Sequence, residues 1–152
     1  MPRLRFRPLA LLIVLTTVSA LTACTTQVVQ ERPDSDLMAV APALSVERFL
    51  QAVNAQDYQA MARLFGTVRG PIEGDRREIE VRMATIAEIL RHRNYEIGSE
   101  RRPPGRESET RRVGVDLTIG NRLIRDVGFM VVQTEEGGWL VEEIDLEKVT
   151  SY

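Results

Sequence analysis

The chain has 152 residues, and its 20 basic residues against 22 acidic ones give a formal net charge of −2 at pH 7. This length suits a single folded domain, and the slight acidic excess disfavours a nucleic-acid-binding protein, which would be basic. The chain has one cysteine, Cys24, and one histidine, His92. It therefore cannot form an internal disulfide, and it lacks the ligands of a typical zinc site.

The N-terminal residues have the features of a secretory signal. Arg3, Arg5 and Arg7 form a basic start, and no acidic residue precedes Glu31. An apolar run of 13 residues follows, over residues 9–21. This run has the length of the apolar region of a signal peptide, and it is too short to cross a membrane as a helix, which takes about 20 residues. The pattern predicts export.

The apolar run ends in Leu21-Thr22-Ala23-Cys24, which resembles the lipobox of bacterial lipoproteins: an aliphatic residue, two small residues and a cysteine. The resemblance implies cleavage before Cys24, lipid with acyl chains such as palmitate on its thiol, and attachment to a membrane. The alternative is an ordinary secretory signal with an incidental cysteine. Thr25, in place of an aspartate after the cysteine, implies an outer-membrane lipoprotein that faces the periplasm, if the source has an outer membrane.

Cleavage after residue 23 would leave 129 residues with a net charge of −5, because the removed segment holds three arginines and no acid. That charge disfavours attraction to anionic lipid, so two or more acyl chains would have to hold the protein on the membrane. Residues 24–43 are polar, contain Pro33 and Pro42, and show no sustained period, which predicts a flexible tether. A folded domain over residues 44–152 is expected to follow.

Three helices are predicted in the first half of that domain, because apolar residues recur there with the spacing of one helical face. Ser45 and Asp57 are expected to be the N-caps of the first two helices. Asp75 and Glu78 resemble a capping box at the start of a third helix that runs to His92. The predicted inward residues are Val46, Phe49, Leu50 and Val53; Tyr58, Met61, Leu64 and Phe65; and Ile79, Met83, Ile86 and Leu90, with Val81 and Ile89 at the margin.

From Tyr95 onward the apolar period changes to two, which predicts about four antiparallel strands. Residues 101–112 are rich in charge and proline and are expected to form a long exposed hairpin loop. Gly120-Asn121 predicts a two-residue hairpin, and apolar residues on both faces of the segment 129–132 indicate a central strand. The last strand is predicted over residues 139–146. Helices followed by an antiparallel sheet indicate the α+β class.

Between the second and third helices, Gly66, Gly70, Pro71 and Gly74 predict turns, with a short hairpin as one option. This order of elements over residues 44–146 resembles the NTF2-like (SnoaL/ketosteroid-isomerase-like) superfamily. The residues that carry the resemblance are 46–58, with Asp57-Tyr58 between two helices, and the closing pattern at 137–144. The resemblance implies N-terminal helices packed on a curved antiparallel sheet that forms a cone with a pocket. The alternative is an open sheet on a helical layer.

Three residues are candidates for the lining of such a pocket: Tyr58, Asp126 and Glu142. Asp126 alternates with apolar or glycine residues, so it is predicted to point inward, where burial would raise its pKa and suit a general base. Glu142 has a similar pattern, although a β-bulge would turn it outward. Tyr58 is expected in the core with its hydroxyl at an edge. His92 is expected to be a surface residue at a helix end, where a cation complements the helix dipole, rather than a catalytic base.

The sequence contains no nucleotide-binding glycine loop and no nucleophile elbow, and its acids do not form a pair at a diagnostic spacing. No catalytic residue, metal ligand or cofactor is therefore predicted. We expect first a non-catalytic envelope module that binds a protein partner or a small apolar ligand, since a concave apolar site suffices for binding. The alternatives are a purely structural lipoprotein and an enzyme of the isomerase, dehydratase or hydrolase type that acts in the cone pocket.

Overall fold

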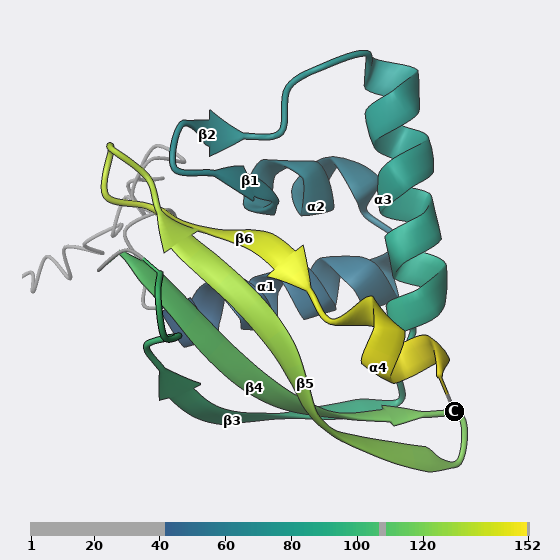
Figure 1. Ribbon diagram of the computed structural model, residues 1–152. Coiled ribbons are helices and arrows are strands. Elements are labelled where there is room, and N and C mark those ends of the chain that lie inside the picture. The colour runs from purple at the N-terminus through teal and green to yellow at the C-terminus, as the bar shows by residue number, and fades with distance from the viewer. Residues whose placement is uncertain (1–41, 107–108, 152) are drawn as a thin grey trace, which may run out of the picture. The chain divides into compact units, whose positions relative to one another are not determined.

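The computed structural model of the protein describes residues 42–106 and 109–151. The predicted signal peptide, the lipobox with Cys24 and the predicted tether up to residue 41 lie outside the described residues. The elements, in chain order, are α1 (Pro42–Ala55), α2 (Tyr58–Leu64), β1 (Gly66–Thr67), β2 (Gly70–Pro71), α3 (Arg76–Leu90), β3 (Asn94–Arg101), β4 (Thr110–Ile119), β5 (Arg122–Gln133), β6 (Trp139–Ile144) and α4 (Leu146–Thr150) (Figure 1).

The last four strands form one antiparallel sheet in the order β3-β4-β5-β6. The predicted two-residue hairpin connects β4 to β5, with Ile119 paired to Arg122. β1 and β2 form a separate two-stranded hairpin, and Phe65 just before it makes a parallel bridge to Val141 in β6. The α+β class, the antiparallel sheet and the interior position of β5 are thus confirmed.

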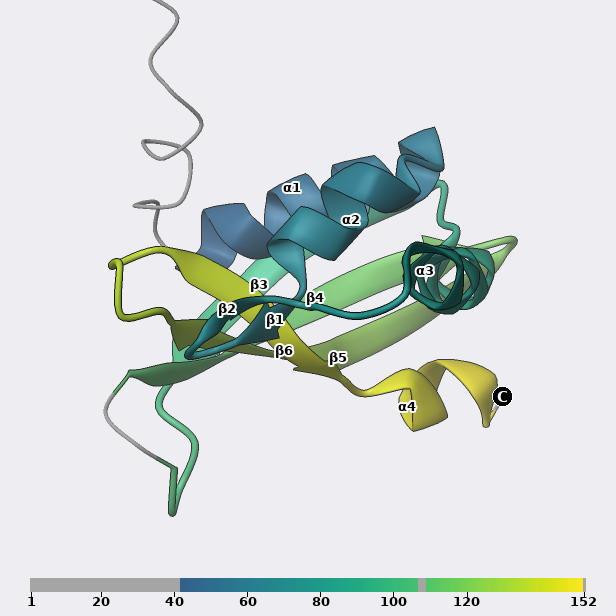
Figure 2. The ribbon, with the colours of Figure 1, turned by 90° about the horizontal axis from the view of Figure 1, so that it is seen from above.

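Helices α1, α2 and α3 lie on one face of the sheet (Figure 2), and α1 contacts each of its four strands. The first predicted helical face is confirmed, because Val46, Phe49, Leu50 and Val53 are all buried. In β4, and in β5 from Val127 onward, the inward residues alternate as strand geometry requires. The helices and the sheet share one core, which includes Phe49, Met61, Met83, Leu90, Val113, Val115, Leu117, Phe129 and Val131.

Two predicted helix starts are confirmed by hydrogen bonds that satisfy free backbone N–H groups of the first turn. The carboxylate of Asp57 accepts from the N–H of Ala60 at 2.9 Å. Asp75 accepts from the N–H of Arg77 at 2.9 Å and from that of Glu78 at 3.1 Å. Local capping chemistry therefore sets where α2 and α3 begin.

The predicted start of the first helix is wrong. α1 begins at Pro42, so residues 42 and 43 belong to the helix instead of the tether. Proline suits a first helical turn because its missing N–H would be unpaired there in any case. Ser45 consequently lies inside the helix, where its buried hydroxyl donates to the carbonyl oxygen of Trp139 at 2.9 Å. This bond ties α1 to the start of β6.

Other predicted boundaries also move. α3 ends at Leu90, and Val81 is 60% exposed, so it does not widen the buried stripe. β3 and β4 extend further than predicted, because β3 ends at Arg101 and β4 begins at Thr110, inside the range expected to form the charged loop. The last strand ends at Ile144, and the unpredicted helix α4 follows, with Asp145 accepting from the N–H of Lys148 at 3.1 Å.

Candidate functional site

The helix-covered face of the sheet is filled by apolar side chains of the chain itself. Phe49 from α1, Met83 from α3, and Leu117 and Phe129 from the sheet have no exposed surface. They belong to the single core cluster that joins the helices to the sheet. Groups that can meet a ligand must therefore be sought on the outer face of the sheet and at its flank.

The sequence predicted that the Asp126 side chain points into the core, but it does not. The pairing of β4 with β5 shifts between the pairs Val115–Val127 and Leu117–Ile124, which places a β-bulge at Asp126. Asp126 has a φ of 51°, in the left-handed region that aspartate tolerates better than most residues. The extra residue breaks the alternation on which the prediction relied, because a bulge re-aims the side chains around it.

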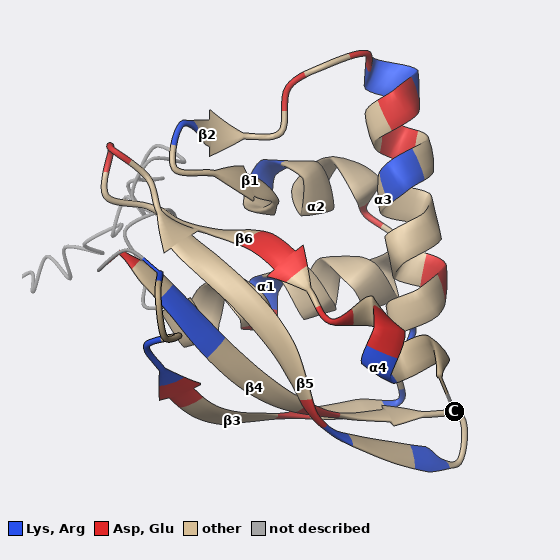
Figure 3. Cartoon of the chain, in the orientation of Figure 1, with Lys and Arg blue, Asp and Glu red and all other residues tan. Residues whose placement is uncertain are grey.

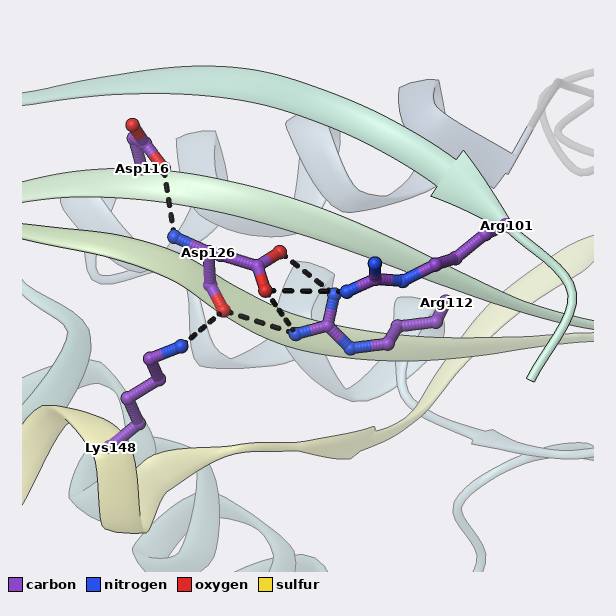
Figure 4. Close-up of polar contacts among 5 residues, drawn as sticks. All are labelled: Arg101, Arg112, Asp116, Asp126 and Lys148. Atoms are coloured by element: carbon purple, nitrogen blue, oxygen red, sulfur yellow. Dashed lines mark hydrogen bonds and ion pairs between the residues drawn. The ribbon is translucent and has the colours of Figure 1, made fainter. Parts of the chain in front are cut away.

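Asp126 is instead the centre of a network of polar contacts on the outer face (Figure 4). Its two carboxylate oxygens accept from the two terminal nitrogens of Arg112, at 2.8 and 3.1 Å, and one of them also accepts from Arg101 at 3.3 Å. Its carbonyl oxygen accepts from Arg112 and from Lys148 of α4, each at 3.0 Å. Its N–H donates to the carboxylate of Asp116 at 2.8 Å. Every polar atom of Asp126 therefore has a partner.

This network reverses the predicted electrostatics of Asp126. The hydrogen bonds from Arg112 hold the pKa of the Asp126 carboxyl below its usual range, with further lowering by the charges of Arg112, Arg101 and Lys148. Burial opposes this shift but does not overcome it, since the side chain is 47% exposed. Asp126 is thus a charged acceptor within the fold, and the predicted raised pKa is wrong.

Two glycines make room for the ion pair between Arg112 and Asp126. Gly114 and Gly128 are paired across β4 and β5. A Cβ atom on Gly114 would collide with the Asp126 carboxylate, and one on Gly128 would lie 2.9 Å from Nε of Arg112. The ion pair therefore lies against a strip of sheet without side chains. The roles of Arg112, Arg101 and Lys148 depend on strand register, so no local sequence pattern predicted them.

A cleft of about 450 Å³ opens at the flank of the sheet, between the β1–β2 hairpin, α3 and β6. Phe65, Arg82 and Glu142 line it, and all three also line a second hollow of about 370 Å³. The two hollows therefore adjoin each other. Thr67, Arg69 and Glu73 contribute to the first hollow, whereas Ile86, Ile144 and Leu146 give the second a more apolar wall.

Arg82 is the cation at the junction of the two hollows. The central carbon of its guanidinium lies 5.2 Å from the centre of the Phe65 ring, within the range of a cation–π contact. No residue in the described part of the chain gives Arg82 a hydrogen bond or an ion pair. Its N–H groups are therefore available to a ligand. No sequence pattern distinguished Arg82 from the other arginines of α3.

Glu142 lies on the opposite wall of the cleft, near the acidic end of β6 seen in Figure 3. The pairing of β5 with β6 shifts between Met130 and Val131, and Glu142 is the extra residue of this bulge. One of its carboxylate oxygens lies 3.3 Å from Arg106, which also contacts Glu143 at 3.0 Å. Glu142 thus lines a hollow at the flank of the sheet, with its charge balanced by Arg106.

Tyr58 and His92 both pack within or against the folded core. Tyr58 packs, partly buried, against the core cluster, and the cleft is lined by other residues. His92 is 7% exposed, so the prediction of a surface position is wrong. Its Nδ1 lies 2.8 Å from the carbonyl oxygen of Leu90, and its Nε2 lies 3.1 Å from the side-chain nitrogen of Asn54. His92 therefore joins the end of α3 to the end of α1.

Among residues 42–106 and 109–151, no cluster of three or more histidine, cysteine, aspartate or glutamate side chains is arranged to hold a metal ion. Over the same ranges, no helix has the length and apolarity needed to span a membrane. Comparison with protein-family models and with curated proteins finds no match for the chain.

Proposed function

We propose that the protein is a lipid-anchored envelope protein whose folded domain binds a protein partner, without catalysis, in the flank cleft. The observation that carries this proposal is the contrast between a filled core and an open cleft with an unpaired arginine. A protein partner is preferred to a small apolar ligand because the helix-covered face of the sheet is occupied by the chain's own side chains. The cleft also offers polar and apolar groups together.

The proposal excludes catalysis because neither candidate acid is placed for it. An enzyme of this size needs a positioned acid or base and a group that stabilises developing charge. The carboxylate of Asp126 accepts hydrogen bonds from Arg112 and Arg101, and its carbonyl oxygen accepts one from Lys148. These contacts hold the carboxylate in the charged form. Glu142 reaches the cleft but is paired with Arg106.

We also propose that the domain has the NTF2-like cone fold. Support comes from the order of elements, in which two helices, a short hairpin and a long helix precede four antiparallel strands. The bridge between Phe65 and Val141 brings the hairpin to the edge of β6, which would extend the sheet around α3. An experimental structure in which the hairpin lies apart from β6 would contradict this assignment.

The proposed anchor is lipid on Cys24, and it rests on the sequence Leu21-Thr22-Ala23-Cys24 alone. A Cys24→Ser variant should lose the lipid and move from the membrane fraction to the soluble envelope fraction. Labelling of cells with a radioactive fatty acid gives an independent measurement of the same step. If the variant is processed and fractionates with the membrane as the wild type does, the proposed anchor is wrong.

Cross-linking in cells tests the proposed partner. A photo-reactive amino acid at Thr85, which lines the second hollow, should give a discrete cross-linked product with another protein. The matched control is the same amino acid at Glu80, an exposed residue of α3 that lines neither hollow. Products from Glu80 and Thr85 alike, or from neither position, would contradict a partner in the cleft and favour a purely structural lipoprotein.

A further inference from the structure

We infer that the ligand of the cleft is an extended peptide segment that places an acidic side chain on Arg82 and an adjacent aliphatic side chain in the second hollow. This inference rests on the proposed binding function and specifies the chemistry of the partner.

The geometry of Arg82 suits the binding of a carboxylate. A guanidinium is planar and carries its N–H donors in a fixed fork that matches the geometry of a carboxylate. Arg82 lies 5.2 Å from the centre of the Phe65 ring and has no acceptor among residues 42–106 and 109–151. Arginine binds carboxylates through two parallel hydrogen bonds, which are stronger than neutral ones.

The pairing of the surrounding charges also favours an acidic ligand. Arg69 and Arg82 place two cations on the walls of the first hollow, against Glu73 and Glu142. The carboxylate of Glu142 is already compensated by Arg106 at 3.3 Å. Arg106 also pairs with Glu143 at 3.0 Å, so the charges around the two hollows balance, while Arg82 itself has no acidic partner among the described residues. An acidic side chain of a ligand would therefore complement Arg82.

The two hollows together suit an extended chain rather than a compact molecule. They meet at Phe65, Arg82 and Glu142, so a ligand that occupies both must cross this junction. β6 is an edge strand of the main sheet, and its residues Glu143 and Ile144 line the second hollow. The outer edge of β6 is bridged to Phe65 at Val141, and Glu143 and Ile144 lie beyond this bridge, where an extended peptide could continue the edge.

The apolar wall of the second hollow is the reason to expect an aliphatic side chain next to the acidic one in the peptide. Ile86 from α3, Ile144 from β6 and Leu146 from α4 line it together with Arg82. An acidic residue bound at Arg82 would place a neighbouring side chain of the peptide over these apolar groups. Burial of an aliphatic side chain there would add to affinity in proportion to the apolar area removed from water.

The experiment is a selection of phage-displayed random seven-residue peptides on the purified full-length chain in detergent. Selected peptides should carry aspartate or glutamate next to an aliphatic residue. Replacement of that acid by its amide should weaken binding about tenfold or more, a change of at least about 1.4 kcal/mol. The protein variant Arg82→Gln should cause the same loss, and the two changes together should give little further loss, because both remove one contact.

A matched variant and a graded one make the result specific. Arg77→Gln removes an exposed arginine of the same helix that lines neither hollow, and it should bind the selected peptides as the wild type does. Arg82→Lys keeps the charge but loses the planar fork, so it should bind with intermediate affinity. Circular dichroism of each variant verifies that α3 is intact.

The outcomes separate this inference from the proposed function. Selected peptides without an acid, or peptides that bind Arg82→Gln unchanged, would overturn the inference and leave a binding cleft in place. Recovery of no peptide, while Thr85 still cross-links a partner in cells, would do the same. Absence of both peptide and cross-link would overturn the inference and the function together. Binding to phosphatidylglycerol vesicles that depends on Arg82, without peptide binding, would assign the cleft to lipid and overturn the peptide.

Discussion

Asp126 and Glu142 both lie at β-bulges of neighbouring strands, yet they end in opposite surroundings. Asp126 has a partner for its carboxylate, its carbonyl and its N–H, and these partners come from β3, β4 and α4. Glu142 has one exposed arginine beside it and lines an open cleft. A charged group whose hydrogen bonds are all made within the fold contributes to stability. A charged group with unused hydrogen-bonding capacity is available to bind a ligand.

The same contrast separates Arg112 from Arg82. Arg112 makes a two-point contact with Asp126, and its side chain is 19% exposed. Arg82 rests on Phe65 without a carboxylate partner. The outer-face network should therefore tolerate little change without loss of stability, and the flank cleft should tolerate change with loss of binding only. The predictions below test that division.

The largest effect is expected from Gly114→Val. A Cβ atom at this position collides with the Asp126 carboxylate, and that carboxylate cannot move without losing Arg112. Excess volume at a packed site costs about 1–3 kcal/mol, and we expect the upper end of that range. Urea unfolding measures the change. The control is Gly105→Asn in the charged loop, where no atom lies within 4 Å of the added Cβ and φ is 73°, which asparagine tolerates. Equal stability of the Gly114→Val variant and the wild type would show that the strip of glycines is not needed.

Asp126→Ala is expected to lower the free energy of unfolding by about 1–3 kcal/mol, because it removes the two carboxylate acceptors of the largely buried Arg112 and leaves only the backbone carbonyl oxygen of residue 126. Alanine also tolerates a φ of 51° less well than aspartate does. Asp126→Asn is the matched variant, since asparagine keeps the backbone preference and one side-chain acceptor. It should lose less stability than the alanine variant. A larger loss for asparagine than for alanine would contradict this account.

The sequence predicted the parts of the fold that depend on neighbouring residues. Asp57 and Asp75 cap their helices as expected, and the change of period near Tyr95 marks the change from helices to sheet. Each of these features is set within a few residues, so a local pattern is sufficient to find it. The α+β class follows from the same local signals.

The site depended on distant pairings that no local pattern encodes. The alternation around Asp126 predicted an inward side chain, but a bulge fixed by pairing with β4 turned it outward. His92 is buried because Asn54, 38 residues earlier, meets it at the end of α1. Arg82 faces Phe65 only once the β1–β2 hairpin reaches β6. These positions are properties of the tertiary structure, which is why the sequence placed Asp126 in a pocket and overlooked Arg82.

A smaller effect is expected from pH. The contact with Arg112 lowers the pKa of Asp126 in the folded state, so the unfolded state binds this proton more readily. The ion pair therefore contributes stability above the usual aspartate pKa of about 4, and this contribution is lost as the pH falls through the lowered folded-state pKa. The difference in unfolding free energy between the wild type and Asp126→Asn should therefore become smaller as the pH is lowered from 5. A difference that stays constant over that range would show that the charge of Asp126 does not matter.

The smallest effect on stability is expected from Glu142→Gln, and it completes the contrast with Asp126. Glu142 meets Arg106 across 3.3 Å, and the Arg106 side chain is 45% exposed, so water can replace either partner. Exposed pairs of this kind contribute about 0–1 kcal/mol, and we expect a change of less than about 0.5 kcal/mol in urea unfolding.

The same substitution removes a negative charge from the wall of the cleft while Arg106 remains. Acidic peptides should therefore bind the variant at least as tightly as the wild type. Titration of one selected peptide against both proteins measures this, with Glu88→Gln as the control, because Glu88 pairs with Arg91 on α3 and lines neither hollow. The contrary result is that Glu142→Gln unfolds the domain or abolishes peptide binding while Glu88→Gln does neither. Glu142 would then be required for the structure or for the site, and the contrast with Asp126 would be wrong.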